Sequence, residues 1–152
     1  MTAAKFVASF AGAGHSPVAP GTAGSLAALV LGALAMHGPV WLLPALAVTA
    51  TVAGLTAIPH AVPDRQADPG WVVIDEVAGQ WIALLGLGAA TPAGLIAAFA
   101  LFRALDIWKP GPIGWADRKP GAIGIMLDDV LAGAIVAVIL IAARSTGLRG
   151  LG

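Results

Sequence analysis

Between Lys5 and Asp64 the chain contains no lysine, arginine, aspartate or glutamate. A soluble domain of 152 residues has too little interior to bury so long an uncharged stretch away from water. Across the whole chain 59% of the residues are hydrophobic and 11% are charged, whereas about 25% charged residues is usual for a soluble domain. The sequence therefore predicts an integral membrane protein, organised as a single domain over residues 1–152.

Two further features of the composition exclude several classes of function. The formal net charge is zero, so the chain offers no basic surface for a nucleic acid, and we expect no nucleic-acid partner. Cysteine is absent, which excludes disulfides, thiolate metal sites and every mechanism with a cysteine nucleophile.

Proline and glycine divide the chain into five apolar segments. Alanine and leucine dominate these segments and no alternation of period two occurs, so the segments are typical of helices rather than of barrel strands. Most are shorter than the roughly 20 residues that cross a bilayer. The prediction is an all-α polytopic membrane protein, a compact bundle of four to five short transmembrane or half-spanning helices. The expected helices cover residues 23–36, 40–58, 75–87, 92–108 and 128–143.

Alternation of five spans predicts how the loops divide between the two sides of the membrane. One side receives the N-terminus and the loops over residues 59–74 and 109–127, and the other receives the short turns around Gly38 and Ala90 and the C-terminal tail. Cations concentrate on the first side, which the positive-inside rule makes cytoplasmic. They are Lys5, Arg65, Arg103, Lys109, Arg118 and Lys119, against Arg144 and Arg149 on the other side.

Five of the eight acidic residues border apolar segments in three places, Asp75-Glu76, Asp106 and Asp128-Asp129. Carboxylates that border lipid or a dry core are costly unless they are paired, bind a metal or line a polar cavity. The loop assignment puts all three places at the cytoplasmic ends of helices, so we predict one cation site built from several helices. The alternative for Asp128 and Asp129, and equally for Asp75 and Glu76, is a stabilising role at a helix N-terminus, where acids complement the helix dipole.

Spacing adds detail to this prediction. The similar strings DEVAG and DVLAG each place a glycine four residues after an acid, which lets another helix approach closely at that level. Neighbouring acids on a helix point about 100° apart, so one of Asp128 and Asp129 can face a metal while the other orients a ligand or a neighbouring helix. Arg103, Asp106 and Lys109 share one helix face, as an internal salt bridge or as a site for metal and phosphate together.

The segment Gly12–Ser25 is rich in glycine and proline and leads into an apolar helix. Free backbone N–H groups at such a helix start favour a phosphate, with Thr22 or Ser25 as the cap, although a re-entrant structural loop is an equal alternative. Carboxylates combined with phosphate-binding groups indicate Mg²⁺, a hard ion that a few acids hold together with substrate oxygens. A lipid phosphate is the natural substrate of such a site in a membrane protein.

Three strings in the chain resemble the signature stretches of the phosphatidylglycerophosphatase A family, in the same order: GAGHSPVAPGTAGSLAA, VIDEVAGQWIALL and FRALDIWKPGPIGWADRKPGAIGIMLDDVLAG. The resemblance implies a Mg²⁺-dependent enzyme of the bacterial inner membrane, multi-pass and with its active site facing the cytoplasm. Such an enzyme hydrolyses phosphatidylglycerophosphate to phosphatidylglycerol and phosphate in phospholipid biosynthesis. The family's acidic and basic motif positions fall on Asp75, Glu76, Arg103, Asp106, Lys109, Asp128 and Asp129.

With this resemblance, Asp75, Glu76, Asp128 and Asp129 are expected to hold one or two Mg²⁺ ions. Arg103 and Lys109 are expected to bind phosphate oxygens with help from Thr22 and Ser25, and Asp106 to orient them or to complete the metal shell. Attack by water and a covalent aspartyl-phosphate on Asp128 or Asp129 both stay open. The competing functions are a small cation transporter and another membrane phospholipid phosphotransferase, and the sequence leaves the oligomeric state undetermined.

Overall fold

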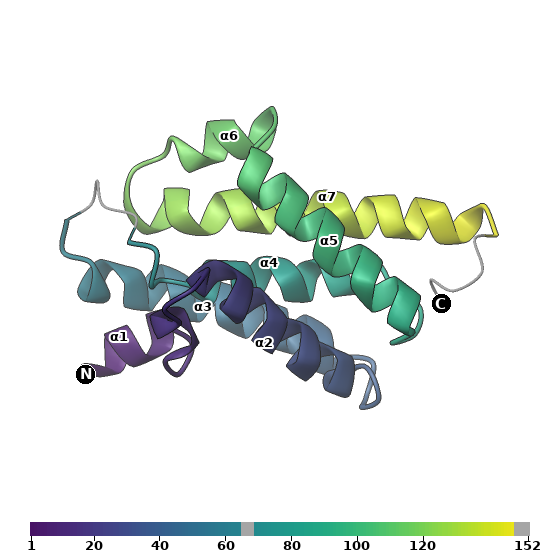
Figure 1. Ribbon diagram of the computed structural model, residues 1–152, viewed down its shortest axis with the longest axis horizontal. Helices are drawn as coiled ribbons and strands as arrows, with labels where there is room; N and C mark the ends of the chain where they lie inside the picture. The colour runs from purple at the N-terminus through teal and green to yellow at the C-terminus, as the bar shows by residue number, and fades with distance from the viewer. Residues whose placement is uncertain (65–68, 148–152) are drawn as a thin grey trace.

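The computed structural model describes residues 1–64 and 69–147, and every regular element in these two ranges is a helix (Figure 1). This confirms the all-helical part of the predicted fold. Arg65 and Arg149, which entered the charge count above, lie outside the described residues. The elements are α1 (Ala3–Ala8), the short 3₁₀ helix η1 (Ala13–His15), α2 (Pro20–Ala35), α3 (Leu42–Ala61), α4 (Ile74–Leu84), α5 (Pro92–Trp108), α6 (Pro112–Asp117) and α7 (Gly121–Ser145).

Two helices of the described ranges, α3 and α7, are long and apolar enough to cross a membrane. With its 20 residues, α3 extends about 30 Å, which matches the hydrocarbon core of a bilayer. The helix α2 is apolar but shorter, and the 11 residues of α4 extend only about 16 Å. The number of membrane spans therefore stays a prediction.

The short helix α4 lies at the centre of the molecule and packs against α2, α3, α5 and α7. Its start is fixed by the backbone N–H of Val73, which donates to the carbonyl oxygen of Ala8 at 2.9 Å. Its second half is fixed by the indole Nε1 of Trp81, which donates to the carbonyl oxygen of Ala28 in α2 at 2.8 Å. Because of these two bonds, the start of α4 keeps a defined position relative to α1 and α2.

Glycines let α4 and α7 approach almost backbone to backbone. A Cβ added to Gly79 would lie 2.6 Å from the carbonyl oxygen of Asp129, and one added to Gly133 would overlap the backbone of Gly79. These are the glycines of the DEVAG and DVLAG strings, so the predicted close approach is confirmed. Asp75 and Asp129 each lie one turn before a glycine of this contact.

The predicted start of the last helix is wrong, because α7 begins at Gly121 rather than at Asp128. Residues 121–127 were expected to be loop because they follow several glycines and prolines, yet they pack as helix against α6 and α3. Asp128 and Asp129 therefore lie about two turns inside a helix. At that depth they contact no free N–H groups of a helix terminus, which removes the helix-dipole alternative for these two residues. Asp75 and Glu76 lie in the first turn of α4, so for them this alternative remains.

Other boundaries also differ from the prediction. The helix α2 starts at Pro20, and its N-cap residue Ala19 makes no side-chain cap, so neither Thr22 nor Ser25 is the cap. Proline suits the first helical position because its missing N–H would have no helical partner there. The helix α3 continues through Pro59 to Ala61, so the proline expected to end the helix lies in its last turn, at the cost of one backbone hydrogen bond. The expected loop 109–127 contains the short helix α6.

The loops separate into two ends of the molecule. The end of α3 and the start of α7 lie together, since Val62 and Gly121 line the same pocket. The turn after α2 and the turn after α4 lie together in the same way, since Gly38 and Gly88 line another pocket. Figure 1 shows the C-terminal end of α7 on the side of this second group. The arrangement matches the two sets of loops expected for spans that alternate.

Candidate active site

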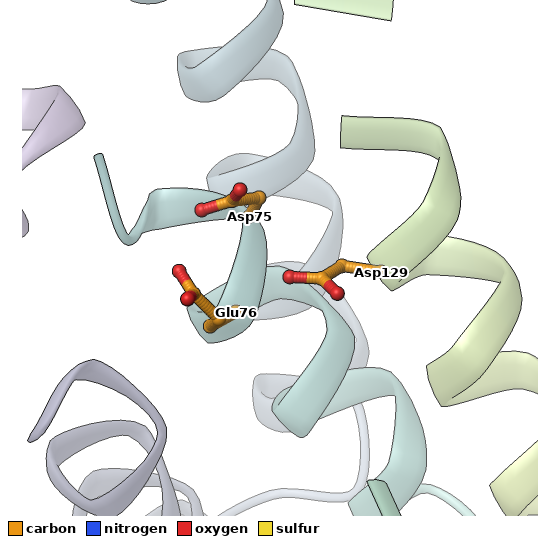
Figure 2. A group of neighbouring side chains, drawn as sticks. All are labelled: Asp75, Glu76 and Asp129. Carbon is orange, nitrogen blue, oxygen red and sulfur yellow. The ribbon is translucent and has the colours of Figure 1, made fainter. Parts of the chain in front are cut away.

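Three carboxylates from two helices meet at the start of α4. Asp75 and Glu76 lie in the first turn of α4, and Asp129 reaches them from α7 (Figure 2). One oxygen from each of the three side chains lies within 4.8 Å of the other two. We call these residues the acid triad. The triad contains three of the four residues predicted to hold a metal, and the Gly79–Gly133 contact one turn away brings the two helices close enough to form it.

The surroundings of the acid triad make a bound cation favourable. Asp75 and Asp129 are buried and Glu76 is half-buried. Oε2 of Glu76 and Oδ1 of Asp129 are shielded from water and accept no hydrogen bond from any described residue. Carboxylates this close together repel one another, and burial removes the water that would screen them. A hard divalent cation relieves both costs, and carboxylate oxygens are the ligands that Mg²⁺ and Ca²⁺ prefer.

Arg103 on α5 supplies a positive charge beside the acid triad. Its Nη1 forms an ion pair with the carboxylate of Asp106, one turn further along the same helix, and lies 3.8 Å from Oε1 of Glu76. Nε of Arg103 is buried and has no hydrogen-bond partner among the described residues. The expected pairing of Arg103 with Asp106 is therefore present, and the guanidinium still has donors available for an anion.

The start of α2 closes over the acid triad from another side. A Cβ added to Gly21 would overlap Oε1 of Glu76 and would lie 3.4 Å from Nη1 of Arg103. A side chain at Gly21 would therefore have to displace the carboxylate of Glu76. Gly21 was not predicted as a site residue, and its signal in the sequence is a glycine directly after the proline that starts the helix. Thr22 follows in the same turn, half-buried. Ser25 is fully buried and its hydroxyl donates to the carbonyl oxygen of Gly21 at 2.9 Å.

Asp128 does not join the acid triad, so its role as a metal ligand stays a prediction. Its side chain points to another side of α7, where Oδ2 accepts a hydrogen bond from Nζ of Lys109 at 2.7 Å. Lys109 also forms an ion pair with Asp117 at the end of α6. Partial burial lowers the pKa of Lys109, but the hydrogen bonds and charges of these two carboxylates outweigh it and hold the pKa above its ordinary value.

Lys109 directly follows α5 in a left-handed conformation, and its ammonium pairs with Asp117 and Asp128 rather than with Asp106. The predicted helix face shared by Arg103, Asp106 and Lys109 therefore holds only for Arg103 and Asp106.

Two further polar residues, one beside Lys109 and one in α4, were not predicted. Asp117 gave no signal because it stands in a segment expected to be loop. Gln80 stands one turn after Glu76; its side chain is fully buried and its amide has no partner among the described residues. Its sequence signal is a glutamine inside an otherwise apolar helix.

The chain was also compared with known proteins. The family model described as phosphatidylglycerophosphatase A matches residues 6–144. The protein named phosphatidylglycerophosphatase A of Escherichia coli (strain K12) is 42% identical over 132 residues, which cover 85% of this chain and 76% of that protein. The protein of the same name from Haemophilus influenzae (strain Rd) is 40% identical over 134 residues, covering 86% of this chain and 81% of that protein.

A third relative carries a different name. A Bacteroides thetaiotaomicron protein named "Putative phosphatidylinositol-3-phosphatase" is 40% identical over 144 residues, covering 88% of each chain. No solved structure matches this chain. The family match covers most of the chain and includes the acid triad, Arg103 and Lys109. The chain belongs to the phosphatidylglycerophosphatase A family and is a phosphatase.

Proposed function

We propose that this protein is a Mg²⁺-dependent lipid phosphatase that hydrolyses phosphatidylglycerophosphate to phosphatidylglycerol and phosphate. The reaction takes place at the cytoplasmic face of the bacterial inner membrane, in phospholipid biosynthesis. The observation that carries the proposal is the buried acid triad beside Arg103, in a chain of this family. The carboxylates of the triad suit a metal ion, and the guanidinium of Arg103 suits the phosphate of the substrate.

The acid triad fits Mg²⁺ by its chemistry. All three side chains offer hard oxygen donors, and two of the buried oxygens, on Glu76 and Asp129, have no other partner among the described residues. A few carboxylates combined with substrate phosphate oxygens are typical of Mg²⁺ in phosphate chemistry. When bound there, the ion neutralises phosphate charge and lowers the pKa of a water molecule.

The chain's own residues bind and orient the phosphate. The guanidinium of Arg103 donates to phosphate oxygens, and Asp106 fixes its orientation through their ion pair. Gly21 brings the start of α2 close to Glu76 and to this guanidinium, and Thr22 presents its backbone N–H to the phosphate in the first turn of α2. Ser25 holds this turn through its bond to Gly21, and Lys109 adds a second cation on the side of Asp128.

Two routes for the phosphoryl group fit this arrangement: direct attack by water, and attack by an aspartate followed by hydrolysis. Of the two candidate nucleophiles, Asp129 lies in the acid triad, whereas Oδ2 of Asp128 accepts a hydrogen bond from Lys109. We favour attack by water. Rapid acid quench of a reaction with ³²P-labelled substrate then leaves no label on the protein, whereas labelled protein would establish the aspartyl route.

The competing function, cation transport, calls for acids distributed along a path through the membrane. At the end of the molecule where the turns after α2 and α4 lie together, neither turn contains an acidic residue, and the carboxylates of the described residues gather toward the opposite end. A site reached from one side suits an enzyme better than a transport path.

The deciding experiment measures phosphate release by the purified protein in mixed micelles that contain phosphatidylglycerophosphate. We expect release with Mg²⁺ and none with excess EDTA. Parallel micelles with phosphatidic acid and with phosphatidylinositol 3-phosphate test the substrate class, since one relative is named for the latter lipid. Release from phosphatidylinositol 3-phosphate alone would replace the proposed substrate, and no release from any of the three by folded protein would refute the proposed function.

A further inference from the structure

One ammonium group in this protein is shared by two carboxylates that differ sharply in exposure. Nζ of Lys109 forms ion pairs with both Asp117 and Asp128. The side chain of Asp128 is 6% exposed and that of Asp117 is 40% exposed, while that of Lys109 itself is 29% exposed. The three residues come from different elements: Lys109 follows α5, Asp117 ends α6 and Asp128 lies inside α7.

The packing of α6 over Lys109 produces this arrangement. Lys109 adopts a left-handed conformation that ends α5, and a Cβ added to Gly114 would lie 2.5 Å from its carbonyl oxygen. The missing side chain of Gly114 therefore lets α6 fold back over Lys109. The side chains of Ile113 and Ala116 are fully buried and hold α6 in place, so that Asp117 arrives beside the ammonium.

We infer that Asp117 is an exchangeable partner of Lys109, which occupies the ammonium in the free protein and leaves it when a phosphate oxygen of the lipid substrate binds there. The inference rests on the proposed function, because it assigns the anion that takes the place of Asp117. Asp117 acts through Lys109 and is a positioning residue rather than a catalytic one.

Charge and burial both select Asp117, not Asp128, as the carboxylate that leaves. Two carboxylates around one ammonium carry a net charge of −1, which repels an incoming phosphate as long as both remain. Separation of Lys109 from Asp128 would leave a buried carboxylate without its counter-ion, at a high desolvation cost. Asp117 is exposed enough to be hydrated when it leaves, and a partly exposed ion pair is weak.

The test is equilibrium binding of inorganic phosphate to the detergent-solubilised protein with Mg²⁺, measured by calorimetry, together with KM and kcat for phosphatidylglycerophosphate. For Asp117→Asn we expect the Kd of phosphate and the KM to fall about two- to fivefold, as suits the loss of a partly exposed competing charge, with kcat within about twofold of wild type. A second variant, Asp117→Ala, should behave in the same way if the asparagine protein is unstable.

Two controls separate this effect from others. Asp64→Asn removes one negative charge from an exposed position outside this cluster, so it reports the general effect of charge on an anionic ligand. The double variant Asp117→Asn with Lys109→Gln should bind phosphate no more tightly than Lys109→Gln alone, because Asp117 acts only through the ammonium. Thermal unfolding of each variant checks that the fold is retained.

An unchanged or higher Kd of phosphate in Asp117→Asn overturns the inference. An equal gain in phosphate affinity in Asp64→Asn also overturns it, as does a gain in phosphate affinity that persists when Lys109 is replaced. A loss of kcat with unchanged KM would instead make Asp117 a permanent anchor for Lys109. Because phosphate binding needs no turnover, the inference can be judged even if phosphatidylglycerophosphate proves to be the wrong substrate. Failure of the proposed function is read separately, from phosphate release by the wild type.

Discussion

Asp129 is the residue at which burial and function conflict most directly. Its carboxylate is almost fully buried, faces Asp75 and Glu76, and has one oxygen without a hydrogen-bond donor among the described residues. A side chain in this position is unfavourable for the fold on its own, because buried like charges repel. It is retained, in our proposal, because it binds the metal.

This conflict predicts opposite effects of Asp129→Asn on stability and on activity. Without Mg²⁺ the variant should melt at the same temperature as the wild type or higher, because one of three repelling charges is gone. Turnover should fall below detection, and so should the gain in melting temperature on addition of Mg²⁺. For the wild type that gain corresponds to about 2.7 kcal/mol when Mg²⁺ is at about 100 times its Kd.

Differential scanning fluorimetry in detergent, with Mg²⁺ or EDTA, gives both melting temperatures, and phosphate release gives the activity. Unfolded or non-inserting Asp129→Asn protein would show instead that the carboxylate is needed for the structure. Full activity in a well-folded variant would remove Asp129 from the site.

For single residues, the sequence predicted three of the carboxylates that the structure brings together, but not that Asp128 lies apart from them. Asp75, Glu76 and Asp129 could be found because charges are rare beside apolar segments and stand out. The separation of Asp128 from Asp129 follows from the 100° step between neighbours on a helix, but which of them faces the triad depends on the rotation of α7. That rotation is set by packing against α4 and α6, over distances along the chain that local pattern does not report.

Among the elements, the contact of α4 with α7 decides whether the acid triad exists at all. The two helices contribute its three acids, and the glycines one turn further on are the points of closest approach. The strings DEVAG and DVLAG allowed this contact to be predicted, because an acid and a glycine four residues apart lie on one helix face. The start of α7 could not be predicted, since residues 109–127 hold the glycines and prolines of a typical loop.

We therefore predict that Gly133→Ala damages both the fold and the site. The added Cβ overlaps the backbone of Gly79, which cannot move aside as a flexible side chain can, so α7 must shift away from α4. The cost should be about 1–3 kcal/mol of folding free energy, as for other overpacked positions, with a lower melting temperature. Activity should fall at least tenfold even at temperatures where the variant is folded, since Asp129 moves with α7.

Gly70→Ala is the matched control, because a Cβ there meets nothing closer than a side-chain atom of Pro20 at 4.0 Å. It should leave melting temperature and activity near wild type. A Gly133→Ala protein with normal activity would show that the acid triad tolerates a wider separation of the two helices than the structure has.

For the whole molecule, the division of loops between two ends predicts its orientation. The end of α3 and the start of α7 share one end with the longest loops, and the turns after α2 and α4 share the other. Among the described residues, cations outside helices are found mainly at the first end, which the positive-inside rule assigns to the cytoplasm. The acid triad lies nearer this end, because α4 begins there.

The absence of native cysteine makes this orientation directly measurable, since a single introduced thiol is the only one in the chain. His37, in the turn after α2, and Arg118, directly after α6, are both exposed and lie outside the ion pairs of the site.

In spheroplasts that express His37→Cys, a membrane-impermeant maleimide should label the protein without lysis. In Arg118→Cys the same reagent should label only after lysis, because the proposed orientation puts this residue on the cytoplasmic side. Labelling of both thiols in intact spheroplasts would contradict a structure that crosses the membrane between them, and the reverse pattern would place the acid triad toward the periplasm. The second outcome would also move the substrate: a phosphatase whose site opens outward could act only on lipid already transferred to the outer leaflet.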